Sequence, residues 1–104
     1  MLKTSIACRN FPHMVRLLEE RIYKRRKRMR ISQEALAERA GLTRNCIQQM
    51  ECYEHIPKTS TLFAVMKALA FSEEESAAFW RDYQEAYRAD RELQRRKEEE
   101  LKPV

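Results

Sequence analysis

Residues that interrupt helices are scarce in this chain. Glycine occurs once in 104 residues, at Gly41, and proline three times, at Pro12, Pro57 and Pro103. Runs in which apolar and polar residues alternate are also missing, which argues against a β-sandwich. A chain of this length suffices for one modest core but not for two. We therefore predict a single all-α domain.

Long apolar runs are absent as well. No stretch approaches the roughly 18 apolar residues that a membrane-spanning helix needs. Residues 1–10 lack the apolar segment that characterises a secretory signal peptide. We therefore expect a cytoplasmic protein with no membrane partner.

Patterns typical of catalysis or metal binding do not occur. The only histidines are His13 and His55, and no glycine-rich phosphate loop is present. We expect no enzymatic activity, no catalytic residue, no cofactor and no metal. The three cysteines, Cys8, Cys46 and Cys52, are an odd number without a C-x-x-C pair, which favours reduced thiols. A redox-sensing cysteine is an open alternative, because it would require a lowered thiol pKa.

Positive charge is concentrated in the N-terminal half. Residues 1–58 contain 13 Lys and Arg against 6 Asp and Glu, a net charge of +7, whereas residues 59–104 contain 8 against 10, a net charge of −2. A basic half of this kind indicates a polyanionic partner, with nucleic acid first and an anionic membrane second.

Apolar residues at helical spacing predict five helices. The first begins near Pro12 and directs Val15, Leu18, Ile22 and Met29 inward. The others cover about 33–39 and 43–53, then start at Thr59 or Ser60 and at Ser72.

Capping residues support these boundaries. Ser32 and Thr43 are suitable N-caps, and Gly41 is suited to the left-handed turn that ends the second helix. Ser72 and Glu75 have the spacing of a capping box.

The run Lys24–Arg30 lies at the end of the first predicted helix. Positive charge there complements the helix dipole. The run is either a solvated helix end or a phosphate contact.

Residues 31–62 carry the most specific pattern in the chain. This segment resembles the lambda-repressor/Cro-like helix-turn-helix family, and the resemblance extends over about residues 18–75. The matching positions are Ser32, Gln33, Leu36, Ala37, Gly41, Leu42, Thr43, Ile47, Glu51 and Pro57. The resemblance implies a compact five-helix, lambda-repressor-like DNA-binding domain, here with an extended C-terminal helix. Its second motif helix, 43–53, would enter the major groove of operator DNA.

The resemblance also implies roles for individual residues. Arg44, Asn45 and Gln49, with Gln48 beside them, would read bases, because these side chains can pair bidentately with guanine or adenine. Two residues at helix starts would contact phosphates, and two others would form a structural ion pair. These residues are Gln33 and Thr43 for phosphate, and Arg26 and Glu51 for the pair.

Two turns and one loop depart from the family pattern. Arg30 and Tyr53 stand where glycine is usual, so the two turns are expected to be strained or altered. The loop after the third helix is often basic in the family, but here it reads Glu54-His55.

The chain divides into three expected parts: an N-terminal arm (1–11), the helix-turn-helix domain (12–72) and a C-terminal helix with a polar tail (73–104). Trp80, Tyr83 and Tyr87 form a stripe on that last helix. We interpret the stripe as a homodimer interface, which predicts an inverted-repeat operator; packing on the chain's own core is the other interpretation. The function implied by the resemblance is sequence-specific binding of double-stranded DNA as a transcriptional regulator, specifically a repressor. The alternative is a protein-binding adaptor or an antitoxin-like partner that keeps the fold.

Overall fold

The computed structural model describes residues 9–101, and Pro12–Leu101 form five helices. The first helix is continuous through α2 (Pro12–Leu18), the π-helical segment η1 (Glu19–Tyr23) and α3 (Lys24–Arg28), and is called the α2–α3 helix here. It is followed by α4 (Gln33–Ala40), α5 (Arg44–Cys52), α6 (Thr59–Ala68) and α7 (Glu73–Leu101). Residues 9–101 contain no strand. The prediction of an all-α fold with an extended C-terminal helix is confirmed, while most of the expected N-terminal arm, residues 1–8, lies outside the described residues.

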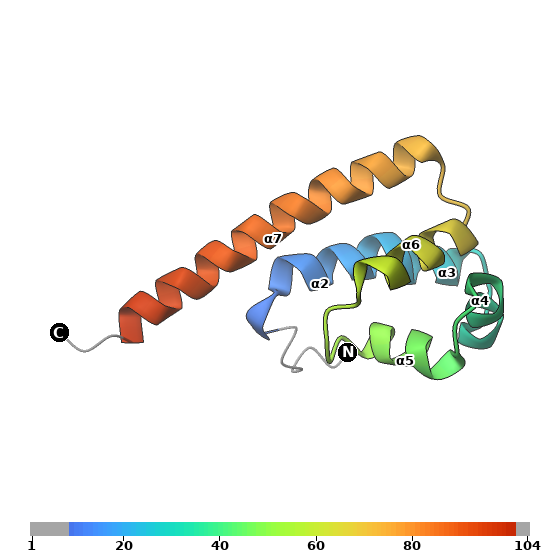
Figure 1. Ribbon diagram of the computed structural model, residues 1–104, viewed down its shortest axis with the longest axis horizontal. Helices are drawn as coiled ribbons and strands as arrows, with labels where there is room; N and C mark the ends of the chain where they lie inside the picture. The colour runs from blue at the N-terminus through green and yellow to red at the C-terminus, as the bar shows by residue number, and fades with distance from the viewer. Residues whose placement is uncertain (1–8, 102–104) are drawn as a thin grey trace.

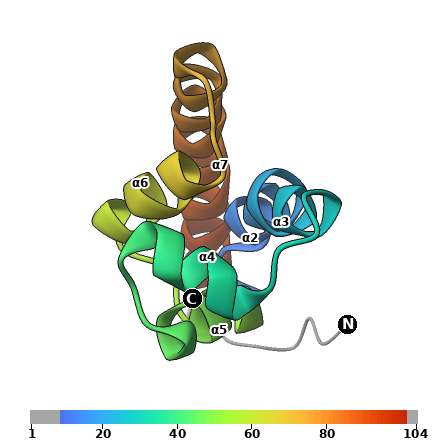
Figure 2. The same ribbon diagram turned by 90° about the vertical axis from the view of Figure 1, so that its right-hand side faces the viewer.

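Helix α7 gives the molecule its elongated shape of 53 × 28 × 21 Å. Figure 1 shows α7 running antiparallel along the α2–α3 helix, with its C-terminal half projecting past the start of α2. Helix α5 lies on the far side of the α2–α3 helix and α6 from the start of α7. Figure 2 shows α4 and α5 crossing steeply below α6. None of the helices in residues 9–101 is long and apolar enough to cross a bilayer.

Every helix contributes to one core. Its most deeply buried side chains come from the α2–α3 helix, α4, α5, α6 and α7, and they are Leu18, Ile22, Leu36, Ile47, Leu62, Val65, Leu69 and Phe79. Helix α7 therefore closes the core with a fully buried phenylalanine. Met29, which was expected to face inward, is 37% exposed. It is the C-cap of α3, where the helical periodicity that predicted its burial ends.

The predicted caps at the helix starts form. The hydroxyl of Ser32 accepts a hydrogen bond from the Ala35 N–H at 3.0 Å, and that of Thr43 accepts one from the Cys46 N–H at 3.1 Å. Each side chain thus satisfies one of the free N–H groups of its helix.

Four helices are followed by a residue in the left-handed backbone conformation. Gly41 has φ of 70°, as its position predicts, and Arg30, Tyr53 and Ala70 have φ of 57°, 58° and 59°. The two turns in which the sequence lacks the usual glycine therefore keep the left-handed conformation. A side chain in that conformation costs about 1–2 kcal/mol, so tertiary contacts must hold these turns.

Asp90 joins α7 to the start of α2. Phe11, the N-cap residue of α2, offers no side-chain hydrogen bond. Instead the Asp90 carboxylate, which is completely buried, accepts hydrogen bonds from the backbone N–H groups of His13 at 3.0 Å and Met14 at 2.9 Å. It also lies 2.6 Å from Nδ1 of His13. A residue 77 positions away thus acts as the cap that the local sequence does not supply.

We expect Asp90→Ala to lower the free energy of unfolding by about 1–3 kcal/mol, because the buried N–H of Met14 and the partly buried N–H of His13 lose their acceptor. Denaturant unfolding of the wild type and the variant measures this. Asp82→Ala is the matched control. Asp82 lies on α7 like Asp90 and pairs with Arg21 of the α2–α3 helix, but its side chain is 36% exposed, so its loss should cost less than about 1 kcal/mol. Equal losses in the two variants would show that Asp90 is not the anchor.

Candidate nucleic-acid interface

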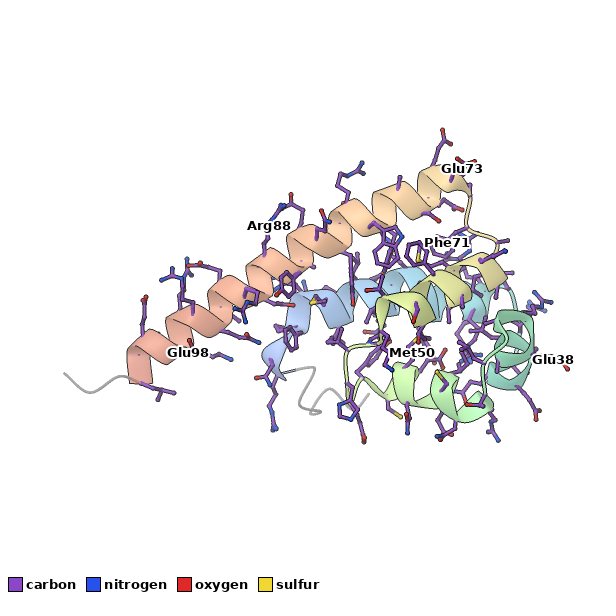
Figure 3. All side chains as sticks on the ribbon, viewed as in Figure 1. Glu38, Met50, Phe71, Glu73, Arg88 and Glu98 are labelled. Atoms are coloured by element: carbon purple, nitrogen blue, oxygen red, sulfur yellow. The ribbon has the colours of Figure 1, made fainter. Side chains whose placement is uncertain are left out.

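The exposed face of α5 gathers the four residues predicted to read bases. Arg44, Asn45, Gln48 and Gln49 are all exposed, whereas Ile47 and Met50 on the opposite face are buried. Figure 3 shows Met50 pointing from α5 into the space between the helices. The spacing i, i+1, i+4, i+5 places the four polar side chains together on one surface. The structure thus presents a polar helix face supported by an apolar one.

The two residues predicted to contact phosphate differ in their surroundings. Thr43 is exposed at the start of α5, where its hydroxyl caps the helix. Gln33 is half-buried at the start of α4, and its Nε2 donates a hydrogen bond to Oε1 of Glu51 at 2.9 Å. An amide nitrogen carries two N–H groups, so this bond uses one of them.

Glu51 is the centre of a hydrogen-bond network joining three helices. Arg26 donates from Nε to Oε2 at 2.7 Å and from Nη2 to Oε1 at 2.9 Å, a bidentate ion pair. The two side chains are only 8% and 6% exposed. Nη1 of Arg26 also donates to the carbonyl of Ile31 at 2.7 Å, in the turn before α4. The network therefore fixes α4 and α5 against the α2–α3 helix.

The basic run of the first helix is divided between interior and surface. Arg25 and Arg26 direct their guanidinium groups into the protein, toward the α6–α7 turn and toward Glu51 respectively. Lys24, Lys27 and Arg28, with Arg30 beyond the helix, are exposed. Neither prediction for the run as a whole, a solvated end or a phosphate contact, describes the half-buried Arg25 and the buried Arg26.

The aromatic stripe on α7 is partly covered by the chain itself. The Trp80 ring lies 5.2 Å from that of Phe79, and the Tyr83 ring stacks on Phe79 at 5.1 Å. Tyr87 is 49% exposed. Phe63 of α6, which the sequence analysis did not identify, is 57% exposed and lies 4.8 Å from Trp80.

Two polar atoms of the stripe are buried. Among the described residues, neither Nε1 of Trp80 nor the hydroxyl of Tyr83 has a hydrogen-bond partner. Burial raises the pKa of Tyr83 to about 12. The hydroxyl of Tyr83 is therefore neutral at physiological pH, and its ring is a packing group.

Positive charge is sparse on the exposed face of α5. Arg44 is its only cation within α5, and the exposed residues Glu54 and His55 follow the helix. The next cation is Lys58, exposed at the start of α6. In residues 9–101, no three His, Cys, Asp or Glu side chains lie close enough to hold a metal ion.

Two helices that cross at a short turn, with the second presenting a polar face, define a helix-turn-helix protein. The family model for this helix-turn-helix matches residues 22–76, slightly more than half of the chain. The protein belongs to the lambda-repressor/Cro-like helix-turn-helix family, whose domain is that of DNA-binding transcriptional regulators. Searches of curated proteins and of solved structures give no match.

We expect Arg26→Met and Glu51→Met each to lower the free energy of unfolding by about 3–5 kcal/mol, because each leaves the other charge buried and unpaired. The double variant should lose less than the sum of the two single losses, by about 0.5–3 kcal/mol. Chemical denaturation of the four proteins gives this double-mutant cycle.

Arg28→Met is the control for this cycle, because Arg28 is exposed in the same basic run. It should change stability by no more than about 0.5 kcal/mol. Strictly additive losses for Arg26 and Glu51 would contradict the network described above.

Proposed function

We propose that the protein is a cytoplasmic transcriptional repressor that binds double-stranded operator DNA with α5 in the major groove. The observation that carries this proposal is the exposed face of Arg44, Asn45, Gln48 and Gln49, held in place by the Glu51 network. Arginine and the two amide types have the donor and acceptor groups that distinguish bases in that groove. Thr43 and Gln33, at the starts of the two motif helices, are proposed phosphate contacts.

A titration of duplex DNA at several salt concentrations tests the proposal. A DNA-binding protein loses affinity with a log–log slope of about 0.9 per phosphate that it neutralises. An adaptor or an antitoxin-like protein that uses only a protein partner should show no such binding. Absence of salt-dependent binding to any duplex in a randomised library would overturn the proposed function.

Arg44→Ala should weaken binding to the selected operator by about 1–3 kcal/mol and relax the preference at one base pair, because a bidentate donor to a base edge is lost. Competition with operators changed one base pair at a time measures this. Lys97→Ala is the control: it removes the same charge from an exposed position on the projecting half of α7. An equal loss on every competitor would make Arg44 a phosphate contact.

Gln33→Ala should weaken binding to all sequences alike, since a phosphate contact carries no base information. The variant also loses the hydrogen bond to Glu51, so its unfolding must be measured together with its binding. A uniform loss at unchanged stability supports the phosphate role. A changed base preference would contradict it.

We further propose that two copies pair through α7, with Tyr87 and the neighbouring Trp80 and Tyr83 at the interface and Phe63 of α6 beside them. The support is the exposure of Tyr87 and Phe63 next to the partly covered Trp80. A twofold dimer would also set two recognition helices about 34 Å apart, one turn of DNA, and so fit an inverted repeat.

Sedimentation equilibrium tests the dimer. The wild type should sediment as a dimer at micromolar concentration, and Phe63→Glu/Tyr87→Glu as a monomer, because both changes place charge on exposed apolar surface. Arg81→Ala, at a 71% exposed side chain on the same helix, should stay dimeric. A wild type that remains monomeric with and without DNA would rule out the dimer.

A further inference from the structure

Arg25 lies inside the turn that connects α6 to α7. Its Nε donates to the carbonyl of Leu69, its Nη2 to the carbonyl of Ala70 and its Nη1 to Oε2 of Glu75, each at 2.9 Å. The guanidinium carbon also lies 4.4 Å from the centre of the Phe71 ring. All three guanidinium nitrogens of Arg25 are therefore used within the seven residues from Leu69 to Glu75.

The turn needs such a partner. The last carbonyl groups of a helix have no N–H donor within the helix itself. Leu69 is the C-cap residue of α6, and Ala70 follows it. Ala70 also has φ of 59°, a conformation that a residue with a side chain rarely adopts. Arg25 supplies donors to both carbonyls and so holds the end of α6 in this conformation.

The same guanidinium reaches the start of α7. Oε1 of Glu75 accepts the Ser72 N–H at 2.9 Å, and the Ser72 hydroxyl accepts the Glu75 N–H at 3.0 Å, which forms the capping box expected from the sequence. The second oxygen of Glu75 is bound by Arg25. The hydrogen bond from Arg25 is the largest cause that lowers the pKa of Glu75 from 4.5 to about 2. The carboxylate therefore stays ionised in its contact with Arg25 near neutral pH.

Arg25 and Arg26 are adjacent in the sequence but bind different parts of the fold. Arg26 binds Glu51 and so holds the α4–α5 pair, whereas Arg25 binds the α6–α7 turn. Two adjacent residues of α3 thus contact the motif helix α5 and the start of α7. Phe71, inside this turn, lies near the start of α7 in Figure 3, far from Glu98 on its projecting half.

We propose that Arg25 is a positioning residue that fixes the direction of α7 relative to the recognition helix, and thereby the spacing of the two half-sites that a dimer reads. The spacing part of this inference rests on the proposed function. A direct phosphate contact by Arg25 is disfavoured because its nitrogens are already hydrogen-bonded and its side chain is only 20% exposed. With Arg25 removed, buried Phe79, the Arg21–Asp82 ion pair and Asp90 still attach α7 to the rest of the protein, so the expected change is in the angle of α7 and not in its attachment.

The first measurement is a distance between two spin labels, on Cys52 of α5 and on Glu98→Cys of α7, in a Cys8→Ser/Cys46→Ala background. The unsubstituted Arg25 protein should give one narrow distance distribution, and Arg25→Met a broadened or shifted one. Arg25→Lys should resemble Arg25→Met, because one ammonium nitrogen cannot reach three acceptors that the planar fork spans. Arg28→Met, the exposed neighbour, should leave the distribution unchanged.

Glu75→Gln gives a second variant should Arg25→Met fail to fold. It keeps an oxygen for the Ser72 N–H and weakens only the contact with Arg25, so a smaller shift in the same direction is expected. Unchanged distributions in the Arg25 and Glu75 variants would overturn the positioning role.

The second measurement selects operators with two half-sites at varied separation. The wild type should prefer one separation by about tenfold, a typical coupling between two sites. Arg25→Met should lose this preference while its affinity for a single half-site stays the same. A preference retained by Arg25→Met would overturn the spacing part. Failure of the wild type to bind any duplex would overturn the proposed function and the spacing part with it, while the label distances still decide whether Arg25 positions α7.

Discussion

The carboxylate of Glu51 is the point at which the helices of the motif meet. It receives two N–H groups from Arg26 and one from Gln33, so α3, α4 and α5 are joined at one side chain. A helix that reads DNA must hold its exposed face at a fixed angle, since small displacements misalign the donors with base edges. The apolar contacts of Ile47 and Met50 bury one side of α5, but burial alone is not directional. The bidentate Arg26–Glu51 pair adds directional hydrogen bonds that fix the angle of α5.

The π-helical segment η1 makes this ion pair geometrically accessible. Leu18, Ile22 and Arg26 are spaced by four residues and all are buried. In an α-helix four residues turn by about 400°, so each step rotates the side chain by about 40° away from the previous one. The wider turn of a π-helix, with its i to i+5 hydrogen bonds, absorbs this rotation. Arg26 therefore faces the same side as the apolar residues that precede it and reaches Glu51.

Local rules of the sequence predicted the parts of the fold that depend on neighbouring residues. Ser32, Thr43, Gly41 and the Ser72–Glu75 box follow from short-range hydrogen bonding, and the structure contains each of them. The exposed face of α5 followed from the resemblance to a family. The capping and turn features need at most four residues of context, which a single sequence contains.

The features that sequence reasoning missed depend on partners far along the chain. Asp90 looks like one more charge in a polar helix, and only the position of α2, 77 residues earlier, makes it a buried cap. Arg25 belongs to a basic run, and its role depends on a turn 44 residues later. Phe63 is one of the apolar residues of α6, and its ring contact is with Trp80, 17 positions later on α7. No period or motif encodes these contacts.

A DNA-binding surface requires both affinity and base preference, and different parts of this protein suit the two requirements. Affinity for DNA comes mainly from cations near phosphates, and base preference comes from donors and acceptors at base edges. The α5 face has three amide side chains and one cation, Arg44, so it suits the second requirement better than the first. Arg25 and Arg26 bind groups of the protein itself. The exposed cations of the run are therefore Lys24, Lys27, Arg28 and Arg30, which lie on the segment leading to the start of α4. For the proposed function, these exposed cations and Lys58 are the side chains suited to phosphate contact, while base preference stays with α5.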